Sequence, residues 1–223
     1  MAKNGSNCKI VVTRNGPYLV CGSLPLAEEV IVSDGEGYPV RWSKGHRYAD
    51  QERYALCRCG QSKNRPYCDG THAKIGFDDT ETASRKKYLE QAEKTSGPAL
   101  ALTDAQELCA AARFCDRAGG VWKLTRESAN VKSKETAIQE ACNCPSGRLV
   151  VWDKKTGKPI EPQLEPSISL VEDPKAKVSG PIWVKGSVSL ESSDGTEYEI
   201  RNRVSLCRCG RSDNKPFCDG SHI

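Results

Sequence analysis

Short runs in which apolar and polar residues alternate occupy both ends of this 223-residue chain. Such alternation is typical of half-buried β-strands. The N-terminal end contains KIVVT, PYLVCGSLPL and EEVIVS, and the C-terminal end contains PIWVKGSVSL and TEYEIRN. Asn15-Gly16 and Asp194-Gly195 are pairs that favour tight turns between antiparallel strands. We therefore predict a small antiparallel β unit at each end.

Between these ends the pattern changes to one that favours helices. Residues 79–100 are polar and charged, which predicts a linker with one solvent-exposed helix at most. The stretch TDAQELCAAARFCDRAGG predicts a helix, with Thr103 and Gln106 as a capping box and Gly119-Gly120 as its end. A second helix is expected over KETAIQEA, followed by a strand at LVVWD.

An internal repeat links the two ends of the chain. The segment CRCGQSKNRPYCDGTH, which starts at Cys57, recurs as CRCGRSDNKPFCDGSH, which starts at Cys207. The similarity extends upstream, where residues 16–23 correspond to residues 180–187, so the ends are a duplication. The first copy also carries an insertion, RWSKGHRYADQ, before its cysteines. We predict an α+β fold in four parts: a first unit (1–78), a linker (79–100), a central helical domain (101–160) and a second unit (161–223).

The composition argues against one large core, because only 37% of the residues are hydrophobic and 6% aromatic. Twelve cysteines suggest that metal or disulfides contribute folding free energy instead. We find no signal peptide and no apolar stretch approaching roughly 18 residues, so we expect a cytoplasmic protein without a membrane partner. In a reducing cytosol, clustered cysteines more often bind metal. A net charge of +4, from 33 basic and 29 acidic residues, predicts a mixed-sign surface and no nucleic-acid partner.

The repeated segment places four metal-ligating side chains at short spacings. Cys57 and Cys59 are two residues apart, so an extended loop can direct both thiolates at one site. If Pro66 lies in the first turn of a helix, Cys68 and His72 share a helix face. The positive end of that helix would favour an anionic centre. Ser62 and Asp69 could supply hydrogen bonds that support the ligands. Three cysteines and one histidine also fit structural zinc.

In both copies the pattern Cys-x-Cys-x2-Ser-x3-Pro-x-Cys-Asp-Gly-Ser/Thr-His resembles the CDGSH, or NEET, iron–sulfur proteins. The resemblance implies two redox-active [2Fe–2S] clusters, each with one iron on the first two cysteines and one on the cysteine–histidine pair. The implied ligands are Cys57, Cys59, Cys68 and His72, and Cys207, Cys209, Cys218 and His222. Single-motif members form intertwined homodimers, so two motifs in one chain imply an internal pseudo-dimer, and we expect a monomer.

The central segment holds a weaker pattern, in which Cys109 and Cys115 are followed by Cys144-Pro145. A bacterial-type ferredoxin run has a middle cysteine where this chain has Ala112. Three thiolates suffice for a [3Fe–4S] cluster, and Cys142 would supply a fourth for [4Fe–4S]. Residues 103–152 resemble a divergent mono-cluster ferredoxin domain, with CPSG as the shared feature. The alternative is that Cys109 and Cys115 are small apolar residues on an Ala-rich helix.

The remaining candidates have weaker patterns. Cys8 and Cys21 have no partner at ligand spacing, and His46 is expected to be an exposed histidine. A ligating histidine must lose its proton, so clusters should become labile as pH falls below about 6.5. Because His222 is the penultimate residue, we expect its site to be less shielded and to release its cluster first.

The function expected from these features is non-enzymatic. The protein would pass electrons to redox partners or donate a [2Fe–2S] cluster to apo-acceptor proteins. A Cys3His zinc-binding interaction module is the alternative. For an enzyme we find no nucleophile–base pair, phosphate-binding loop or cofactor fingerprint beyond the clusters.

Overall fold

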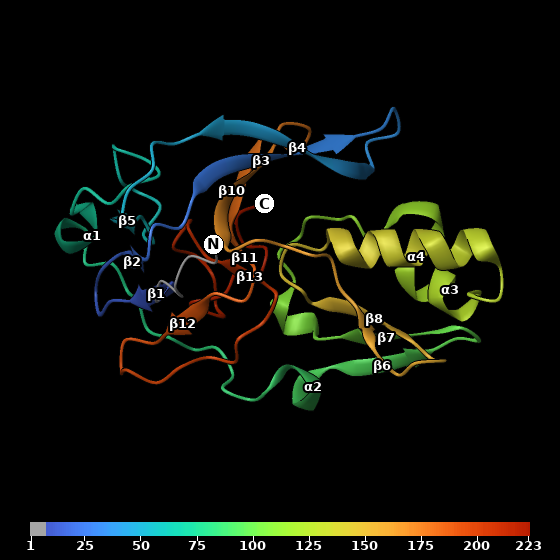
Figure 1. Cartoon of the computed structure of the whole chain (residues 1–223). Coiled ribbons are helices and arrows are strands. Elements are labelled where there is room, and N and C mark those ends of the chain that lie inside the picture. Colours follow the sequence, from blue (N-terminus) through green and yellow to red (C-terminus); the bar gives the residue numbers. More distant parts are fainter. Residues whose placement is uncertain (1–7) are drawn as a thin grey trace, which may run out of the picture.

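The computed structural model describes residues 8–223, which form small open sheets and short helices (Figure 1). The strands are β1 (Lys9–Val12), β2 (Tyr18–Cys21), β3 (Leu26–Ser33), β4 (Pro39–Arg47), β5 (Arg53–Leu56), β6 (Glu93–Ser96), β7 (Leu100–Asp104), β8 (Leu149–Asp153), β9 (Pro159–Ile160), β10 (Ser167–Asp173), β11 (Val178–Lys185), β12 (Ser189–Glu191) and β13 (Arg203–Leu206). The α-helices are α1 (Thr71–Lys74), α2 (Tyr88–Gln91), α3 (Val121–Arg126) and α4 (Val131–Asn143), and two 3-10 turns lie at Gln106–Leu108 and Arg117–Gly119.

The two repeats exchange one strand each. The first sheet has the order β12-β1-β2-β5, and the second has the order β13-β11-β10-β3-β4. Strand β12 of the second repeat pairs in parallel with β1, placing Leu190 opposite Ile10. In the same way β3 of the first repeat pairs in parallel with β10, placing Leu26 opposite Ile168. The expected internal pseudo-dimer is therefore confirmed, and its halves are joined by strand exchange.

The exchange places the apolar faces of both sheets in one shared core. Along β1 and β2 every second side chain turns toward this core, as the sequence pattern predicts, whereas β10, β11 and β13 are buried on both faces. At about 25 cal/mol per Å² of apolar surface, such burial is the main term stabilising the paired sheets. The fully or almost fully buried members include Ile10, Val12, Tyr18, Val20, Leu56, Ile168, Leu170, Ile182 and Leu206.

The central region adds a third sheet, in the order β6-β7-β8-β9, covered by α3 and α4. Its own core contains Leu100, Leu102, Val121, Ala137 and Leu149. Figure 1 shows α1 at one end of the molecule and α3 with α4 at the other. The C-terminus and the sheet of the second repeat lie between them.

Several local expectations are confirmed. Strand β8 coincides with LVVWD, and α4 includes KETAIQEA. The turn at Asn15-Gly16 joins the antiparallel pair β1 and β2. Within residues 8–223, no helix is long and apolar enough to cross a bilayer.

The helix predicted from Thr103 is wrong. Thr103 lies within β7 rather than at the start of a helix. Cys109 and Cys115 lie on an irregular loop with a positive φ at Ala111 and Arg113. Alanine favours helices, but here the chain wraps around a pocket rather than along an axis. The segment predicted as a linker, residues 79–100, includes β6 as well as α2, because β6 pairs with the edge of β7.

Candidate metal centres

The first repeat brings its four predicted ligands together as two pairs. Cys57 follows β5 directly, and its Sγ lies 3.7 Å from that of Cys59. The Cys68 Sγ lies 3.2 Å from His72 Nδ1. The placement of Pro66 in a helix is wrong: the helix begins at Thr71, so His72 lies on α1 while Cys68 precedes it.

The second repeat reproduces this geometry without a helix. The Sγ atoms of Cys207 and Cys209 lie 3.7 Å apart, and Cys218 Sγ lies 3.4 Å from His222 Nδ1. The residues around His222 form a turn. Within residues 8–223, no group of three Cys, His, Asp or Glu side chains is placed to hold a single metal ion. The donors in each repeat therefore meet as two pairs.

The distance within each donor pair is close to that between two ligands of one tetrahedral metal ion. Two thiolates bound to one metal at about 2.3 Å lie about 3.8 Å apart, and a thiolate and an imidazole nitrogen lie about 3.5 Å apart. The distances in both repeats come close to these values. Each pair could thus hold one metal of a binuclear centre.

Hydrogen bonds shape each ligand loop in the same way. Asp69 accepts from the backbone N–H of Lys63 and of Thr71, and these bonds hold the pKa of its carboxyl well below its usual range. Ser62 Oγ donates to Tyr67 O at 2.6 Å. The corresponding Asp219 and Ser212 make the equivalent bonds in the second repeat. The supporting role predicted for Ser62 and Asp69 agrees with these bonds, which fix the ligand loop.

An arginine between the first two cysteines of each motif, buried in the first repeat and partly buried in the second, ties the loop to the preceding hairpin. Arg58 donates to Thr13 O and Gly16 O and pairs with Asp79 at 3.3 Å. Its counterpart Arg208 donates to Gly180 O and pairs with Glu172 at 2.6 Å. Sequence reasoning missed these arginines, although their recurrence within CRCG was visible in the repeat.

Burial keeps several of the thiols protonated when no metal competes for them. It raises the pKa of Cys218 to about 12 and also raises the pKa of Cys59 and Cys115. A hydrogen bond from Cys207 instead lowers the pKa of Cys209 below its ordinary range. Metal binding at these sites would therefore release protons, as expected for thiolate coordination.

The two ligand loops touch each other at paired glycines. A Cβ added to Gly60 would lie 2.6 Å from Cys209 O, and one added to Gly210 would lie 2.7 Å from Cys59 O. Both glycines have a positive φ, so conformation and contact each require glycine. Tyr18 strengthens the link, because its hydroxyl donates to Cys207 O in the other repeat at 2.8 Å.

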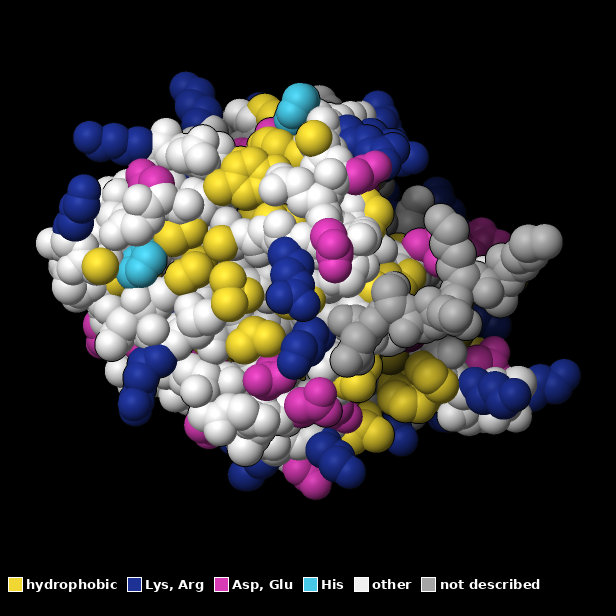
Figure 2. All heavy atoms as spheres, turned by 60° about the vertical axis from the view of Figure 1, so that its left-hand side comes forward, with side chains coloured by type: hydrophobic (Ala, Val, Ile, Leu, Met, Phe, Trp, Pro, Cys, Tyr) yellow, Lys and Arg dark blue, Asp and Glu magenta, His cyan; other side chains and the backbone are white. Residues whose placement is uncertain are grey.

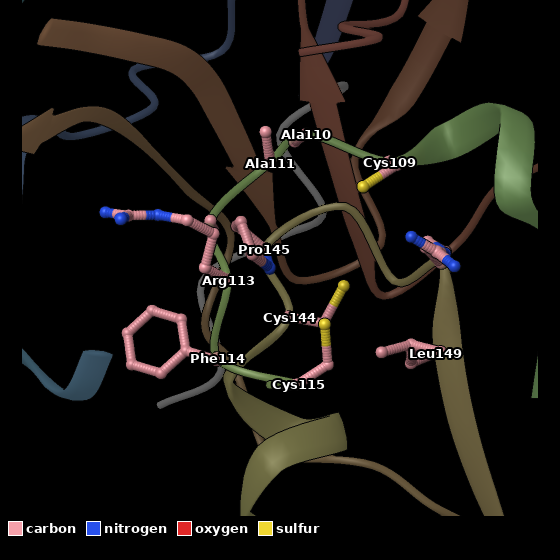
Figure 3. Close-up of a pocket in the computed structure, with 11 residues that line it drawn as sticks. Cys109, Ala110, Ala111, Arg113, Phe114, Cys115, Cys144, Pro145 and Leu149 are labelled. Atoms are coloured by element: carbon pink, nitrogen blue, oxygen red, sulfur yellow. The ribbon is translucent and has the colours of Figure 1, made fainter. Parts of the chain in front are cut away.

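The central cysteines line a separate small pocket. Figure 3 shows the thiols of Cys109, Cys115 and Cys144 turned into the same space, while Phe114 points away from it. The Arg148 guanidinium also borders the pocket beside Cys109 and makes a bidentate pair with Asp104 at 2.6 and 2.9 Å. Three thiolates and a cation at one pocket suit an anionic cluster.

The other predicted or excluded residues lie outside this pocket. Cys142 does not line it; its thiol faces Ile160 O at 3.7 Å, so the fourth thiolate expected from this residue is not brought to the pocket. Cys8 faces Gly22 O, and Cys21 lies on β2. His46 is exposed, as expected, and stacks edge-on against Tyr48.

Arg203 was also missed by sequence reasoning. Its side chain is fully buried on β13 and donates to Ala141 O and Cys144 O, both at 2.7 Å, and to Glu161. It therefore satisfies carbonyls at the end of α4 and fixes the loop that bears Cys144. No sequence signal marked it, since the corresponding Arg53 is exposed.

The two sites are shielded to a similar extent, because each has two buried and two half-buried ligands. Cys218 is 3% exposed where Cys68 is half-buried, but Cys59 is 6% exposed where Cys209 is half-buried and lines a pocket with His222. The loop bearing Cys109 covers the second site, because a Cβ added to Gly220 would lie 3.1 Å from Ala111 Cβ. The weaker shielding expected from the penultimate position of His222 is therefore not seen in the burial of the ligands, and the order of cluster release stays a prediction.

The molecular surface carries charges of both signs. Figure 2 shows one face on which lysines and arginines alternate with aspartates and glutamates, and hydrophobic side chains are scattered between them. The mixed-sign surface predicted from the composition is present on this face.

Comparison with protein families gives two matches. Residues 15–73 and 179–223 match the iron-binding zinc finger CDGSH type. Residues 95–154 match the divergent 4Fe-4S mono-cluster family. Searches of curated proteins and of solved structures return no match for this chain.

Proposed function

Because this chain is a CDGSH-type iron–sulfur protein with a divergent 4Fe–4S mono-cluster region between its two CDGSH regions, we propose that it carries electrons or donates clusters without catalysing a reaction of its own. Two [2Fe–2S] clusters would be held by the paired ligands of the two repeats. A third cluster, [3Fe–4S] or [4Fe–4S], would be held by Cys109, Cys115 and Cys144.

The single observation that carries this proposal is the pairing of donors. In each repeat a cysteine pair 3.7 Å apart faces a cysteine–histidine pair, and each pair suits one tetrahedral iron. A [2Fe–2S] cluster needs two protein ligands per iron, since sulfides fill the other positions. A zinc ion would need all four donors at one point.

The chain's own residues set the properties of these sites. The Nδ1 atoms of His72 and His222 face their cysteines, so the Nε2 atoms remain to exchange protons or contact a partner. The backbone N–H groups of Gly70 and Gly220 donate to the ligand sulfurs at 3.5 Å, which stabilises added negative charge. When bound, the clusters would supply one-electron chemistry, with the imidazole ligand raising the potential above that of an all-cysteine cluster.

Anaerobic purification followed by iron, sulfide and zinc analysis tests the proposal. We expect iron with acid-labile sulfide, and visible absorption that bleaches on addition of dithionite. A colourless protein that contains zinc would overturn it in favour of an interaction module. Incubation of the loaded protein with an apo-ferredoxin separates the two roles, because iron moves to the acceptor only if clusters are donated.

A further inference from the structure

The three candidate sites are unequally connected. We propose that the second CDGSH-type site is the junction of a linear series, so that an electron exchanged between the central site and the first CDGSH-type site passes through it. This inference rests on the proposed function, since it assumes that all three sites hold clusters. It adds an order that neither the repeat nor the family matches contain.

The closest contact between the first and second ligand loops is made by backbone at the paired glycines. Gly60 lies against Cys209, and Gly210 lies against Cys59, so no side chain separates the two ligand loops. Both contacts involve a residue directly adjacent to a ligand or a ligand itself. The two CDGSH-type sites are therefore neighbours across the pseudo-twofold axis.

The contact between the second and central sites lies on the other side of the second site. Gly220, two residues from both Cys218 and His222, packs against Ala111, and a Cβ added there would lie 3.6 Å from Cys109 O. The side chain of Asn214 also donates to Glu107 O at 2.6 Å. Ligand-bearing loops of the two sites are thus in direct contact.

The first site has no equivalent of this contact. Gly70 occupies the position of Gly220 and has a similar φ, +81° against +91°, yet a Cβ added to it would meet no atom of residues 8–223 within 4 Å. Arg203 binds the Cys144 loop, whereas the corresponding Arg53 is exposed. The central region contacts both repeats, but the ligand loop it packs against at these glycines is that of the second repeat. Figure 1 shows the C-terminus, which bears His222, between the two outer regions.

This arrangement fixes the order of one-electron steps. A reduced flavoprotein or ferredoxin-type partner would supply the electron at one end of the series. Each step oxidises one centre by one electron and reduces its neighbour by one, with no bond made or broken. Because electron transfer slows steeply with distance, the step that skips the second site would not compete.

Electron paramagnetic resonance of the full-length protein tests the order. Neighbouring paramagnetic centres speed each other's spin relaxation, which microwave power saturation measures. The variants are Cys68→Ala, Cys218→Ala and Cys144→Ala, each shown by iron analysis to have lost one centre. Cys142→Ala is the matched control, since this cysteine does not line the central pocket and should leave every signal unchanged.

We expect Cys218→Ala to remove the relaxation enhancement from both remaining signals. We expect Cys68→Ala to leave the signal of the central centre unchanged, and Cys144→Ala to slow relaxation at the second site only. The linear series would be overturned if spin relaxation of the central centre slowed in Cys68→Ala. It would also be overturned if that relaxation were unchanged in Cys218→Ala.

A glycine pair keeps the test valid if Cys218→Ala does not fold. Gly220→Val and Gly70→Val impose the same backbone strain, but only the first presses on the central loop. We expect Gly220→Val to weaken coupling between the second and central signals and Gly70→Val to preserve it; equal effects would refute the order. Wild-type protein without iron and sulfide would instead refute the proposed function.

Discussion

The two histidines are the proposed ligands through which acid would act on the sites. Each Nδ1 faces a cysteine thiol, at 3.2 Å for His72 and 3.4 Å for His222, in the position where a proton would compete with iron. A cysteine in this position would remain an anionic ligand to lower pH, because iron holds thiolate more firmly than imidazole.

His72→Cys should therefore make the first cluster more resistant to acid and lower its reduction potential. The loss of visible absorbance between pH 8 and 5, together with a redox titration, measures both effects in a variant whose second site has been removed. His46→Cys serves as the control, because His46 is exposed and belongs to neither ligand pair, and it should change neither. Unaltered acid lability in His72→Cys would exclude His72 as a ligand.

Arg203 joins β13 to the central region through several buried hydrogen bonds. Arg203→Met would remove the buried donor from the carbonyls at the end of α4 and the charged partner from Glu161. Removing one partner of a buried ion pair costs about 3 kcal/mol or more. At this chain length we expect the melting temperature to fall by roughly 6–12 °C.

The repeat provides the control for this prediction. Arg53→Met changes the same residue at the corresponding strand position, but the side chain is exposed, so the melting temperature should move little. Equal shifts in the two variants, measured by circular dichroism, would show that burial and hydrogen bonding of Arg203 contribute nothing.

At the scale of elements, the insertion of the first repeat supports the central loop. Trp42 on β4 packs against Phe114, with ring centroids 4.7 Å apart, and against Trp183 at 4.9 Å. Its Nε1 donates to Asn143 O, next to Cys144. The insertion thus reaches across to the pocket that the central cysteines line.

Trp42→Ala should lower the occupancy of the central cluster and spare the two CDGSH-type clusters. The loss of aromatic packing exposes Phe114 and loosens the loop between Cys109 and Cys115. Iron content per chain and the rate of bleaching in air measure the effect. Trp42→Phe, which keeps the ring contacts, should retain most of the central cluster; equal loss at all three sites would contradict the prediction.

The surroundings of His222 allow us to predict the order in which the two clusters are released in acid. Burial, together with Arg208 and Arg211, lowers the pKa of His222 below its ordinary value of 6.5. A proton then displaces iron from His222 only at lower pH, and the loop over Gly220 restricts access. The second cluster should outlast the first as pH falls. Single-site variants, Cys68→Ala and Cys218→Ala, compared by absorbance at stepwise lower pH, report each site, and earlier loss from the second would refute this order.

Sequence patterns predicted the secondary-structure elements and the candidate ligands better than they predicted which elements pack or pair with one another. The repeated cysteines and histidines located both pairs of donors, since ligand spacing is local information. The family resemblance implied a pseudo-dimer, but the strand patterns did not identify β3 and β12 as the exchanged strands, because an apolar alternation defines a strand but not the strand it joins. The loop after Thr103 was mistaken for a helix, since alanine propensity is a weak preference that packing around the pocket overrides. Arg203 and Arg53 look alike in sequence, and only the docked central region distinguishes them.

At the scale of the whole molecule, strand exchange makes each repeat incomplete alone. Residues 1–78 would present β3 without β10 and β1 without β12. Two copies of this fragment could satisfy both edges by the same exchange, because β3 of one could pair with β1 of the other.

We therefore expect the isolated fragment 1–78 to dimerise, whereas the full chain should stay monomeric. Light scattering coupled to size-exclusion chromatography measures both masses. Addition of the separately produced fragment 79–223 should convert the homodimer into a 1:1 complex. A stable monomer of fragment 1–78 that still binds iron would contradict the role given to the exchanged strands.

Covalent joining of the exchanged halves also frees them from symmetry. In a homodimer every substitution occurs in both subunits. A surface that binds one further domain is therefore present twice, and one of its two copies stays uncovered. Here Gly220 receives Ala111 while Gly70 faces open space, and Arg203 is buried while Arg53 is not. The second repeat can thus specialise in contact with the central region. The first repeat keeps its site exposed on the surface, where a partner protein can bind.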